Sequence, residues 1–373
     1  MEAFLKSIEI IFRRALIRFL RPLVRSHRRP PVAVDFNRCK FLFVRQDRIG
    51  DVLISSPLFA ALKVRHPEAT IDVLLSSNNH FVLANDPLIR KRWIYEKNLS
   101  SAWKILTGLW AERYDFVIDL MDNPSATSTV ICLLSRARWT VGLEKDNSYA
   151  YDIVVPLMSR RDTHIVDRIA SLLLPFGIQP EKENLRIRYF VSQESLRWAS
   201  TILDNFGSPG APIIGINISA GDEVRFWGVD NFRSLIGHIQ SHLSGYRILI
   251  LSKPSHDSMA RSIADGLSGV FLSPITKSFD EFAALIKHLQ ILITPDTSAA
   301  HVAAAFQIPA VVMYVQSNKD LRIWEPYGSP HEVLVADVDD LTVISPRSVF
   351  EAFERLLNRT RTLEQSNSIA ARS

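Results

Sequence analysis

Short apolar runs alternate with amphipathic stretches along most of the chain. The first series of runs covers 41–44, 71–75, 116–120 and 153–155, and the second covers 213–216, 248–251, 270–272, 291–293, 310–314 and 333–335. Short runs rich in Val and Ile, separated by helical patterns, are typical of buried parallel strands joined through helices. The pattern predicts an α/β protein with two doubly wound sheets.

The two series are separated by a change in composition. Residues 192–199 follow a helical pattern, and the Gly/Pro-rich cluster over 206–212 is typical of a domain boundary. Ligands of doubly wound sheets bind at the carboxyl ends of the strands, so two facing domains would form a cleft lined by strand-to-helix loops. We expect a first domain over 38–190, a second over 208–340, a C-terminal helix over 345–362 and a flexible tail over 363–373.

Charge changes this picture only at the amino end. Residues 1–31 hold eight Lys or Arg and two Glu, whereas the rest of the chain holds 36 basic and 37 acidic residues. Nucleic-acid-binding proteins usually carry a basic stripe across a folded domain, which this near-neutral remainder does not favour. The two cysteines, Cys39 and Cys132, lack metal-ligand spacing and fit a reducing compartment.

Residues 1–31 have the period of a basic amphipathic helix. Leu5, Phe12 and other apolar side chains fall on one face, and Arg14 and Arg18 lie nearly opposite. Arginines interrupt the segment too often for a spanning helix, and it lacks the apolar centre of a signal peptide. We interpret it as a membrane-interfacial helix of a cytoplasmic protein that is peripheral on the inner, anionic face of the cytoplasmic membrane. The alternative is a helix that packs on the protein's own surface.

The first strand-to-helix loop contains Arg45-Gln-Asp-Arg-Ile-Gly-Asp51. Gly50 would let the backbone turn sharply and keep the approach to the helix open. Asp51 is suited either to cap the helix or to take part in chemistry. Ser56-Pro57 offers a second cap and a first-position proline, which would leave Asp51 free. A single glycine without Gly-Lys-Ser/Thr argues against a dinucleotide fingerprint and a P-loop.

A second loop joins the run over 291–293 to an alanine-rich stretch. It contains Asp296, Thr297 and Ser298, and small hydroxylated residues at a helix start leave backbone amides open to an anion. With the helix dipole, this favours a diphosphate site, although a capped helix with nothing bound is the alternative. His301 is placed either to touch a ligand or to bond a loop carbonyl.

A third loop follows the first strand of the second series. Ser219 and Gly221 offer contacts for phosphate oxygens and Arg225 offers a fixed cation, while a solvated arginine is the alternative. Farther along, 337–340 reads Asp-Val-Asp-Asp, which resembles the metal-binding Asp-x-Asp of some sugar transferases. We interpret that stretch as a solvated turn and expect no metal site.

Four motifs stand in order between about residues 40 and 330. They are Arg48-Ile-Gly-Asp-Val52, Pro57 with Ala60-Ala-Leu-Lys63, Asp296-Thr297 with His301-Val-Ala-Ala304, and Trp324-Glu-Pro-Tyr-Gly328. Together they resemble glycosyltransferase family 9, the bacterial heptosyltransferases. The resemblance implies a GT-B fold of two Rossmann-like domains and inverting transfer without a metal or other cofactor. In the best-known members the donor is ADP-heptose and the acceptor is the inner core of lipopolysaccharide.

The resemblance also implies roles for individual residues. Asp51 would be the general base that deprotonates the acceptor hydroxyl in the first, acceptor-binding domain. Asp296, Thr297 and His301 would hold the diphosphate and sugar of the donor in the second domain. Arg225 stands where the family usually has a lysine that contacts phosphate.

Two departures from the family pattern concern the donor site. Ser298 stands where the family usually has glycine, and the segment 252–257 replaces a glycine-rich nucleotide loop. In that segment His256 or Asp257 would contact the nucleoside. The departures leave the base and the sugar of the donor open.

The sequence therefore predicts a glycosyltransferase that adds a heptose or related sugar to a lipid-linked saccharide. One alternative is a nucleotide-sugar epimerase of the same architecture, which would act on the donor without an acceptor. Another is an inactive, membrane-peripheral scaffold for polysaccharide assembly. Retention of both Asp51 and Asp296-Thr297 speaks against the scaffold.

Overall fold

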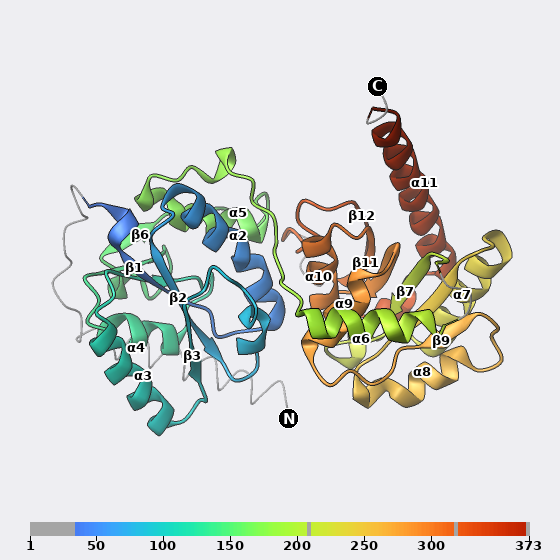
Figure 1. Ribbon diagram of the computed structural model, residues 1–373, viewed down its shortest axis with the longest axis horizontal. Helices are drawn as coiled ribbons and strands as arrows, with labels where there is room; N and C mark the ends of the chain where they lie inside the picture. The colour runs from blue at the N-terminus through green and yellow to red at the C-terminus, as the bar shows by residue number, and fades with distance from the viewer. Residues whose placement is uncertain (1–33, 207–209, 317–319, 371–373) are drawn as a thin grey trace. The chain divides into compact units, whose positions relative to one another are not determined.

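Two six-stranded sheets form the framework of the chain. The computed structural model describes residues 34–206, 210–316 and 320–370, and the helix predicted over 1–31 lies outside the described residues. The chain divides into two units, the first ending at Leu185 and the second beginning at Arg186 (Figure 1).

The first unit is built on strands β1 (Lys40–Val44), β2 (Thr70–Ser76), β3 (Lys91–Tyr95), β4 (Phe116–Asp119), β5 (Trp139–Leu143) and β6 (Ile153–Val155). All neighbours are parallel, in the order β3-β2-β1-β4-β5-β6, which is the order of a doubly wound nucleotide-binding fold. Its helices are α2 (Ile49–Arg65), α3 (Leu99–Glu112), α4 (Ala126–Leu134) and α5 (Ile165–Ala170).

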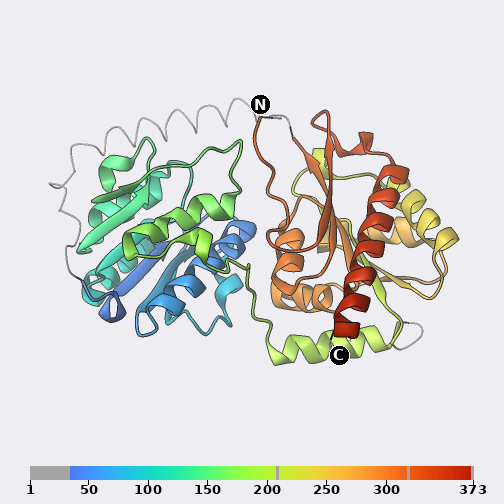
Figure 2. The same cartoon turned by 90° about the horizontal axis from the view of Figure 1, so that it is seen from above.

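The second unit repeats this order. Its strands are β7 (Ile213–Asn217), β8 (Arg247–Leu251), β9 (Val270–Leu272), β10 (Ile291–Pro295), β11 (Ala310–Val315) and β12 (His331–Ala336), arranged β12-β11-β10-β7-β8-β9. Its helices are α6 (Gln193–Asp204), α7 (Val229–His242), α8 (Asp257–Ala264), α9 (Phe279–Lys287), α10 (Ser298–Phe306) and α11 (Pro346–Ala370). Figure 2 shows α11 running along one side of this sheet.

The strand orders define one switch point in each sheet. In the first sheet β2 and β3 lie on one side of β1, and the chain then crosses to β4 on the other side of β1. In the second sheet β8 and β9 lie on one side of β7, and β10 lies on its other side. Val44 is paired with Asp119, so the last residues of β1 and β4 lie side by side. Ligands of doubly wound folds bind at this kind of position, outside the carboxyl ends of the strands.

The hydrophobic pattern identified ten of the strands, and two others were missed. β3 lies at the edge of the first sheet and begins with Lys91 and Arg92, so that only its last three residues are apolar. β5 is fully buried, but its sequence Trp-Thr-Val-Gly-Leu includes a hydroxyl and a glycine. Gly142 is required there because a Cβ would lie 2.4 Å from ring atoms of Tyr151.

The division between the units precedes the Gly/Pro cluster over 206–212, where the composition predicts the boundary. α6 belongs to the second unit, where it packs against α9. The Asp280 carboxylate accepts hydrogen bonds from Tyr189 Oη at 2.9 Å and Ser192 Oγ at 2.6 Å. Arg247 also donates to the carbonyls of Leu203, Phe206 and Ala211, so the segment around the cluster is bound to the second unit.

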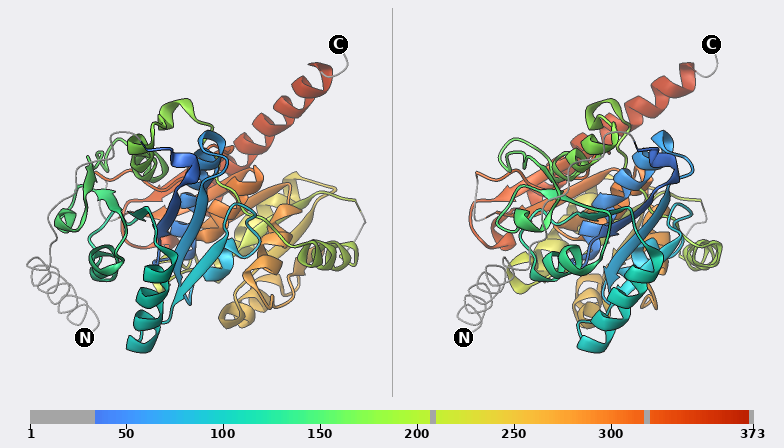
Figure 3. Two further views of the ribbon diagram at one scale, coloured as in Figure 1. Left: turned by 60° about the vertical axis from the view of Figure 1, so that its left-hand side comes forward. Right: turned by 90° about the vertical axis from the view of Figure 1, so that its left-hand side faces the viewer.

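The last helix is longer than the sequence indicated. α11 continues to Ala370, past residue 362, where we ended the helix and began a flexible tail. Figure 3 shows the carboxyl end of α11 projecting beyond the rest of the second unit. Because no glycine or proline interrupts residues 347–370, nothing local ends the helix at 362.

We predict that Gly142→Ala destabilises the protein by about 1–3 kcal/mol, because the added methyl group overlaps the Tyr151 ring. The ring is held by hydrogen bonds to Asp119 and Asn147 and has little freedom to move. The matched control is Gly237→Ala on the exposed side of α7, where a Cβ meets open space. Since alanine favours a helix over glycine by roughly 0.5–1 kcal/mol, Gly237→Ala should stabilise. Equal urea midpoints for the two variants would contradict this account.

Candidate functional site

A fully buried guanidinium lies at the switch point of the first sheet. Arg45 directly follows β1, and its Nη1 donates to the Leu120 carbonyl at 2.5 Å across the end of β4. Its Nε donates to the Asp51 carbonyl at 3.1 Å, and its Nη2 donates to Asp51 Oδ1 at 2.9 Å. Although burial opposes the charge, Asp47 and Asp51 raise the pKa of Arg45 above its ordinary value. Arg45 therefore fixes the loop after β1 to the first turn of α2.

Asp51 forms both a helix cap and an ion pair. It is the third residue of α2, and its Oδ2 accepts a hydrogen bond from the backbone N–H of Arg48 at 3.2 Å. Its other oxygen is bound to Arg45, so both carboxylate oxygens are committed. The side chain is 8% exposed. Asp51 is thus held in one orientation at the carboxyl edge of the sheet.

Our expectation that Ser56-Pro57 starts the helix was wrong. α2 begins at Ile49, Pro57 lies inside it, and Ser56 Oγ donates to the Leu53 carbonyl at 2.7 Å. Gly50 is the second helical residue, so the chain turns before it and not at it. Without a second cap at Ser56, the capping contact falls on Asp51, which is not free as we had supposed.

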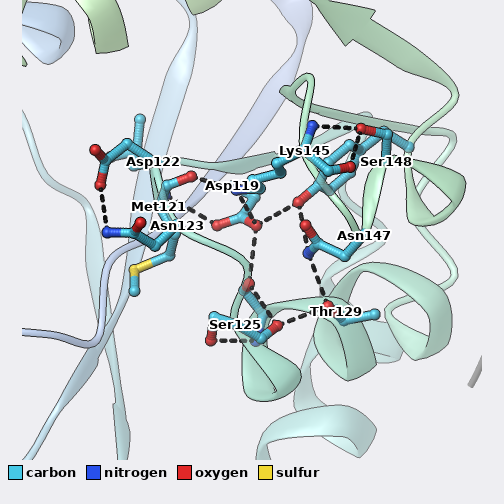
Figure 4. Close-up of polar contacts among 12 residues, drawn as sticks. Asp119, Met121, Asp122, Asn123, Ser125, Thr129, Lys145, Asn147 and Ser148 are labelled. Carbon is cyan, nitrogen blue, oxygen red and sulfur yellow. Dashed lines mark hydrogen bonds and ion pairs between the residues drawn. The ribbon is translucent and has the colours of Figure 1, made fainter. Parts of the chain in front are cut away.

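Asp119, at the end of β4, is the centre of a second buried polar cluster (Figure 4). Its carboxylate accepts hydrogen bonds from Ser128 Oγ at 2.8 Å, Tyr151 Oη at 2.6 Å and Lys145 Nζ at 3.1 Å. Burial, followed by the charge of Asp119, raises the pKa of Tyr151 well above its ordinary value. With these three donors, the fully buried carboxylate is paired and hydrogen-bonded, as a buried charge requires.

Two arginines meet at Asp122 in the loop after β4. Arg168 Nη2 lies 3.0 Å from Asp122 Oδ2, and Arg160 Nη2 lies 3.4 Å from the same oxygen. Burial lowers the pKa of Arg168 below its ordinary value. The sequence did not predict these three residues as site residues, nor did it predict Asp119 and Lys145. The available signal was the position of both aspartates at the end of an apolar strand, since Asp119 is the last residue of β4 and Asp122 lies in the loop that follows.

In the second unit the polar residues at the switch point are mostly neutral. Asn217 ends β7, and its Nδ2 donates to Thr294 Oγ1 at 2.9 Å on β10 and to Thr297 Oγ1 at 3.2 Å. Asn217 Oδ1 accepts from the Ser219 backbone N–H at 3.2 Å. The loops after β7 and β10, which lie far apart in the sequence, are therefore joined directly. Neither Asn217 nor Thr294 was predicted as a site residue.

The loop after β10 forms a capped helix start, the local structure that the sequence analysis gave as the alternative. Thr297 is the N-cap of α10, and its Oγ1 accepts a hydrogen bond from the Ala299 backbone N–H at 3.3 Å. Ser298 is the first helical residue, and His301 is buried on the same helix at 4% exposure. The amino end of α10, with its positive dipole, thus lies at the switch point of the second sheet.

The structure brings Arg225 close to Asp296. Nη1 of Arg225 lies 3.8 Å from Asp296 Oδ2, and the two side chains are 27% and 30% exposed. Nε of Arg225 lies 3.8 Å from Asp222 Oδ2. A Cβ at Gly221 would lie 3.6 Å from Arg225 Nη1, so the loop passes directly beside the guanidinium. Unlike Arg45, this arginine is partly open to solvent.

The segment after β8 adjoins the same loops. Lys253 donates its backbone N–H to Ser219 Oγ at 2.8 Å and its Nζ to the Ala220 carbonyl at 2.8 Å. His256 lies edge-on to the Phe226 ring at 5.7 Å, and burial and then Lys253 lower its pKa. Asp257, in contrast, pairs with Arg261 at 2.9 Å on its own helix. Of the two residues considered for nucleoside contact, His256 lies nearer the switch-point loops.

The described residues contain neither a metal-type cluster nor a membrane-type helix. Within the described ranges, no group of three or more His, Cys, Asp or Glu side chains is arranged to hold a metal ion. Asp340 caps a short helical turn by accepting hydrogen bonds from the N–H and Oγ1 of Thr342. Nor is any helix of the described part both long enough and apolar enough to cross a bilayer.

Comparison with known proteins gives consistent results. The family model described as glycosyltransferase family 9 (heptosyltransferase) matches residues 102–342. Lipopolysaccharide heptosyltransferase 3 of Escherichia coli is 25% identical over 343 residues, which cover 84% of this chain and 98% of that protein.

Two solved structures share the fold. A glycosyl transferase family 9 protein from Veillonella parvula superposes with a TM-score of 0.77 at 19% identity, covering 88% of this chain and 99% of that one. E. coli heptosyltransferase WaaC with ADP gives a TM-score of 0.68 at 19% identity, covering 85% and 99%. The two doubly wound units are therefore those of a GT-B fold.

Proposed function

The chain belongs to glycosyltransferase family 9 and is a glycosyltransferase; on this premise, we propose that it transfers a heptose or related sugar, with inversion, from an ADP-activated donor to a lipid-linked saccharide. The acceptor class is the lipopolysaccharide core or a similar surface glycan. The observation that carries the proposal is the switch-point cluster of the second unit, in which Arg225 lies beside Asp296 and the capped start of α10.

This cluster suits the diphosphate of a nucleotide sugar. Backbone N–H groups at the start of α10 and the Arg225 guanidinium would bind its oxygens, with Ser219, Thr297 and Ser298 as hydroxyl donors. The ion pair at 3.8 Å is long, so Arg225 would turn to a ligand without losing a short hydrogen bond to Asp296. Cationic and amide groups would stabilise the departing diphosphate, which is the task a metal ion performs in other transferases.

ADP is the nucleotide we propose because a solved structure with this fold contains ADP in a heptosyltransferase. His256, beside Phe226, would lie near the nucleoside, and His301 would approach the sugar or diphosphate from α10. We therefore assign the second unit as the donor-binding unit and the first as the acceptor-binding unit.

Asp51 is the general base in this proposal. The acceptor hydroxyl oxygen attacks the anomeric carbon, the bond from that carbon to the diphosphate oxygen breaks, and the hydroxyl proton passes to the carboxylate. ADP leaves with the electron pair of the broken bond. Arg45 and the Arg48 N–H hold Asp51 in a fixed orientation, which favours proton transfer along one direction.

A lipid-linked acceptor lies at the membrane surface, and the basic segment over 1–31 suits the anionic inner leaflet. We propose that this segment makes the enzyme peripheral on the cytoplasmic face. Membership in a transferase family favours this function over the epimerase and the scaffold.

Arg225→Ala should weaken ADP binding by about 10- to 100-fold, since a charge-assisted hydrogen bond contributes roughly 1.5–3 kcal/mol. Isothermal titration calorimetry with ADP measures this dissociation constant. Arg347→Ala is the matched control, because that arginine is 83% exposed and pairs only with Glu351 in the described part of the chain. An unchanged dissociation constant for Arg225→Ala would remove the diphosphate assignment.

Asp51→Asn should lower the rate of sugar transfer by at least ~100-fold while the dissociation constant for ADP stays unchanged. The rate is measured as ADP release from ADP-heptose in the presence of a truncated lipopolysaccharide core. Asp35→Asn removes an exposed carboxylate of the same unit and should retain the wild-type rate. Weakened ADP binding with transfer intact would contradict the role of Asp51 as base.

Deletion of residues 1–31 should release the enzyme from vesicles of anionic lipid, because the eight basic residues of this segment are lost. Cosedimentation with vesicles of phosphatidylglycerol measures the bound fraction, and vesicles of phosphatidylcholine are the control. If the truncated and full-length proteins cosediment equally, the segment serves the fold and not the membrane.

A further inference from the structure

Two carboxylates share the buried guanidinium at the switch point of the first sheet. Arg45 Nη2 contacts Asp51 Oδ1 at 2.9 Å, and Arg45 Nε lies 3.3 Å from Asp47 Oδ1. The Arg45 side chain has no exposed surface, whereas that of Asp47 is 23% exposed. One positive charge therefore faces two negative charges where solvent screens them weakly.

The two carboxylates are not equivalent. Both oxygens of Asp51 accept hydrogen bonds, from Arg45 and from the Arg48 N–H. Asp47 Oδ1 is buried and accepts no hydrogen bond from the described residues, although it lies in ion-pair range of Arg45. Arg45 neutralises one carboxylate of the pair, and the other remains as an excess negative charge.

The backbone around Asp47 is fixed from neighbouring elements. Asn79, after β2, donates its Nδ2 to the carbonyls of Arg45 and Asp47, each at 3.3 Å. Asn79 Oδ1 in turn accepts the Ser76 N–H at 2.8 Å. The position of Asp47 is thus determined by the end of β2 as well as by the loop after β1.

We propose that Asp47 is a positioning residue for the transfer reaction: it shares Arg45 with Asp51 and supplies the excess negative charge that makes this carboxylate pair a proton acceptor. The inference rests on the proposed function of Asp51. It adds that Asp51 paired with Arg45 alone would form a neutral pair, which is a poor base.

The charges that face Asp47 support this reading. Burial is the largest influence and raises its pKa to about 7; Arg45 lowers it, while Asp51 and Asp122 raise it. Arg48 lies on the same loop, and Asp119 acts on the shared Arg45. A general base is most effective when its pKa is near the working pH. The excess charge is thus gained as the pH rises through the neutral range.

The test uses Asp47→Asn, which keeps the shape of the side chain and removes its charge. We expect wild-type kcat to fall as the pH drops below about 7, as Asp47 takes up a proton. In Asp47→Asn, kcat should be low and should not show this fall near pH 7. It should lie roughly ten-fold below the wild-type kcat at pH 8 and close to the wild-type kcat at pH 5.5. KM for ADP-heptose should not change, because the donor loops are in the other unit.

A second measurement needs no substrate. Because the pKa of Asp47 is higher in the folded protein than the ordinary value of 3.8, protonation of Asp47 favours the fold. This contribution to stability is complete below pH 3.8 and is lost as the pH rises to about 7. Asp47→Asn cannot ionise, so its Tm relative to wild type should be higher at pH 8 than at pH 5, by about 3 °C or more. Glu68→Gln, at an exposed carboxylate before β2, is the control and should leave both the Tm difference and kcat unchanged.

The outcomes separate the inference from the proposed function. If kcat of Asp47→Asn still falls below about pH 7 as in wild type, the inference is overturned. It is also overturned if the Tm difference between Asp47→Asn and wild type does not change with pH. If wild-type protein binds ADP but transfers no sugar, the proposed function fails, and the Tm measurement still decides whether Asp47 ionises against Arg45. If kcat of Asp47→Asn shows no fall below about pH 7 and the Tm difference from wild type depends on pH, the proposal is supported.

Discussion

A guanidinium without exposed surface is the constraint on which the carboxyl edge of the first sheet depends. A buried charge that loses its partners destabilises a protein by roughly 3–5 kcal/mol, so every group around Arg45 must supply compensation. The Leu120 carbonyl, the Asp51 carbonyl and the Asp51 carboxylate do so, and they come from the end of β4 and the start of α2. The same contacts that satisfy Arg45 therefore fix the orientation of Asp51.

The two switch points use the same geometry for different chemistry. In the first unit, charged side chains are buried and already paired, as in the contacts of Asp119 with Lys145 and of Asp122 with Arg168. Such groups are fixed in position by their partners and are not available to bind a new ligand without breaking an ion pair. In the second unit, neutral donors such as Asn217 and Thr297 surround a partly exposed Arg225. A cation that keeps access to solvent is free to exchange its partner for a ligand, which suits binding and release of a diphosphate.

The hydrophobic pattern predicted most of the fold because strands buried on both faces must be continuously apolar. It failed where another constraint governed the residues. Lys91 and Arg92 are tolerated in β3 because an edge strand is exposed on one side, and Gly142 is required in β5 because the Tyr151 ring occupies the space of a side chain. The second unit begins before the Gly/Pro-rich segment, and Arg247 donates to the carbonyls of Phe206 and Ala211, contacts that composition does not reveal.

The sequence by itself determined the α/β class, the two sheets and the loops in which polar residues gather, because local periodicity and position after a strand are properties of neighbouring residues. It also indicated a helix start at residues 296–298, since that signal depends only on the residues themselves and on the alanine-rich stretch that follows. Only the tertiary structure decided that Asp51 is bound to a buried Arg45, and that Asp47 competes for the same guanidinium. The contact of Arg45 with the Leu120 carbonyl depends in addition on the parallel register of β1 with β4, which brings residues 75 positions apart into hydrogen-bonding distance.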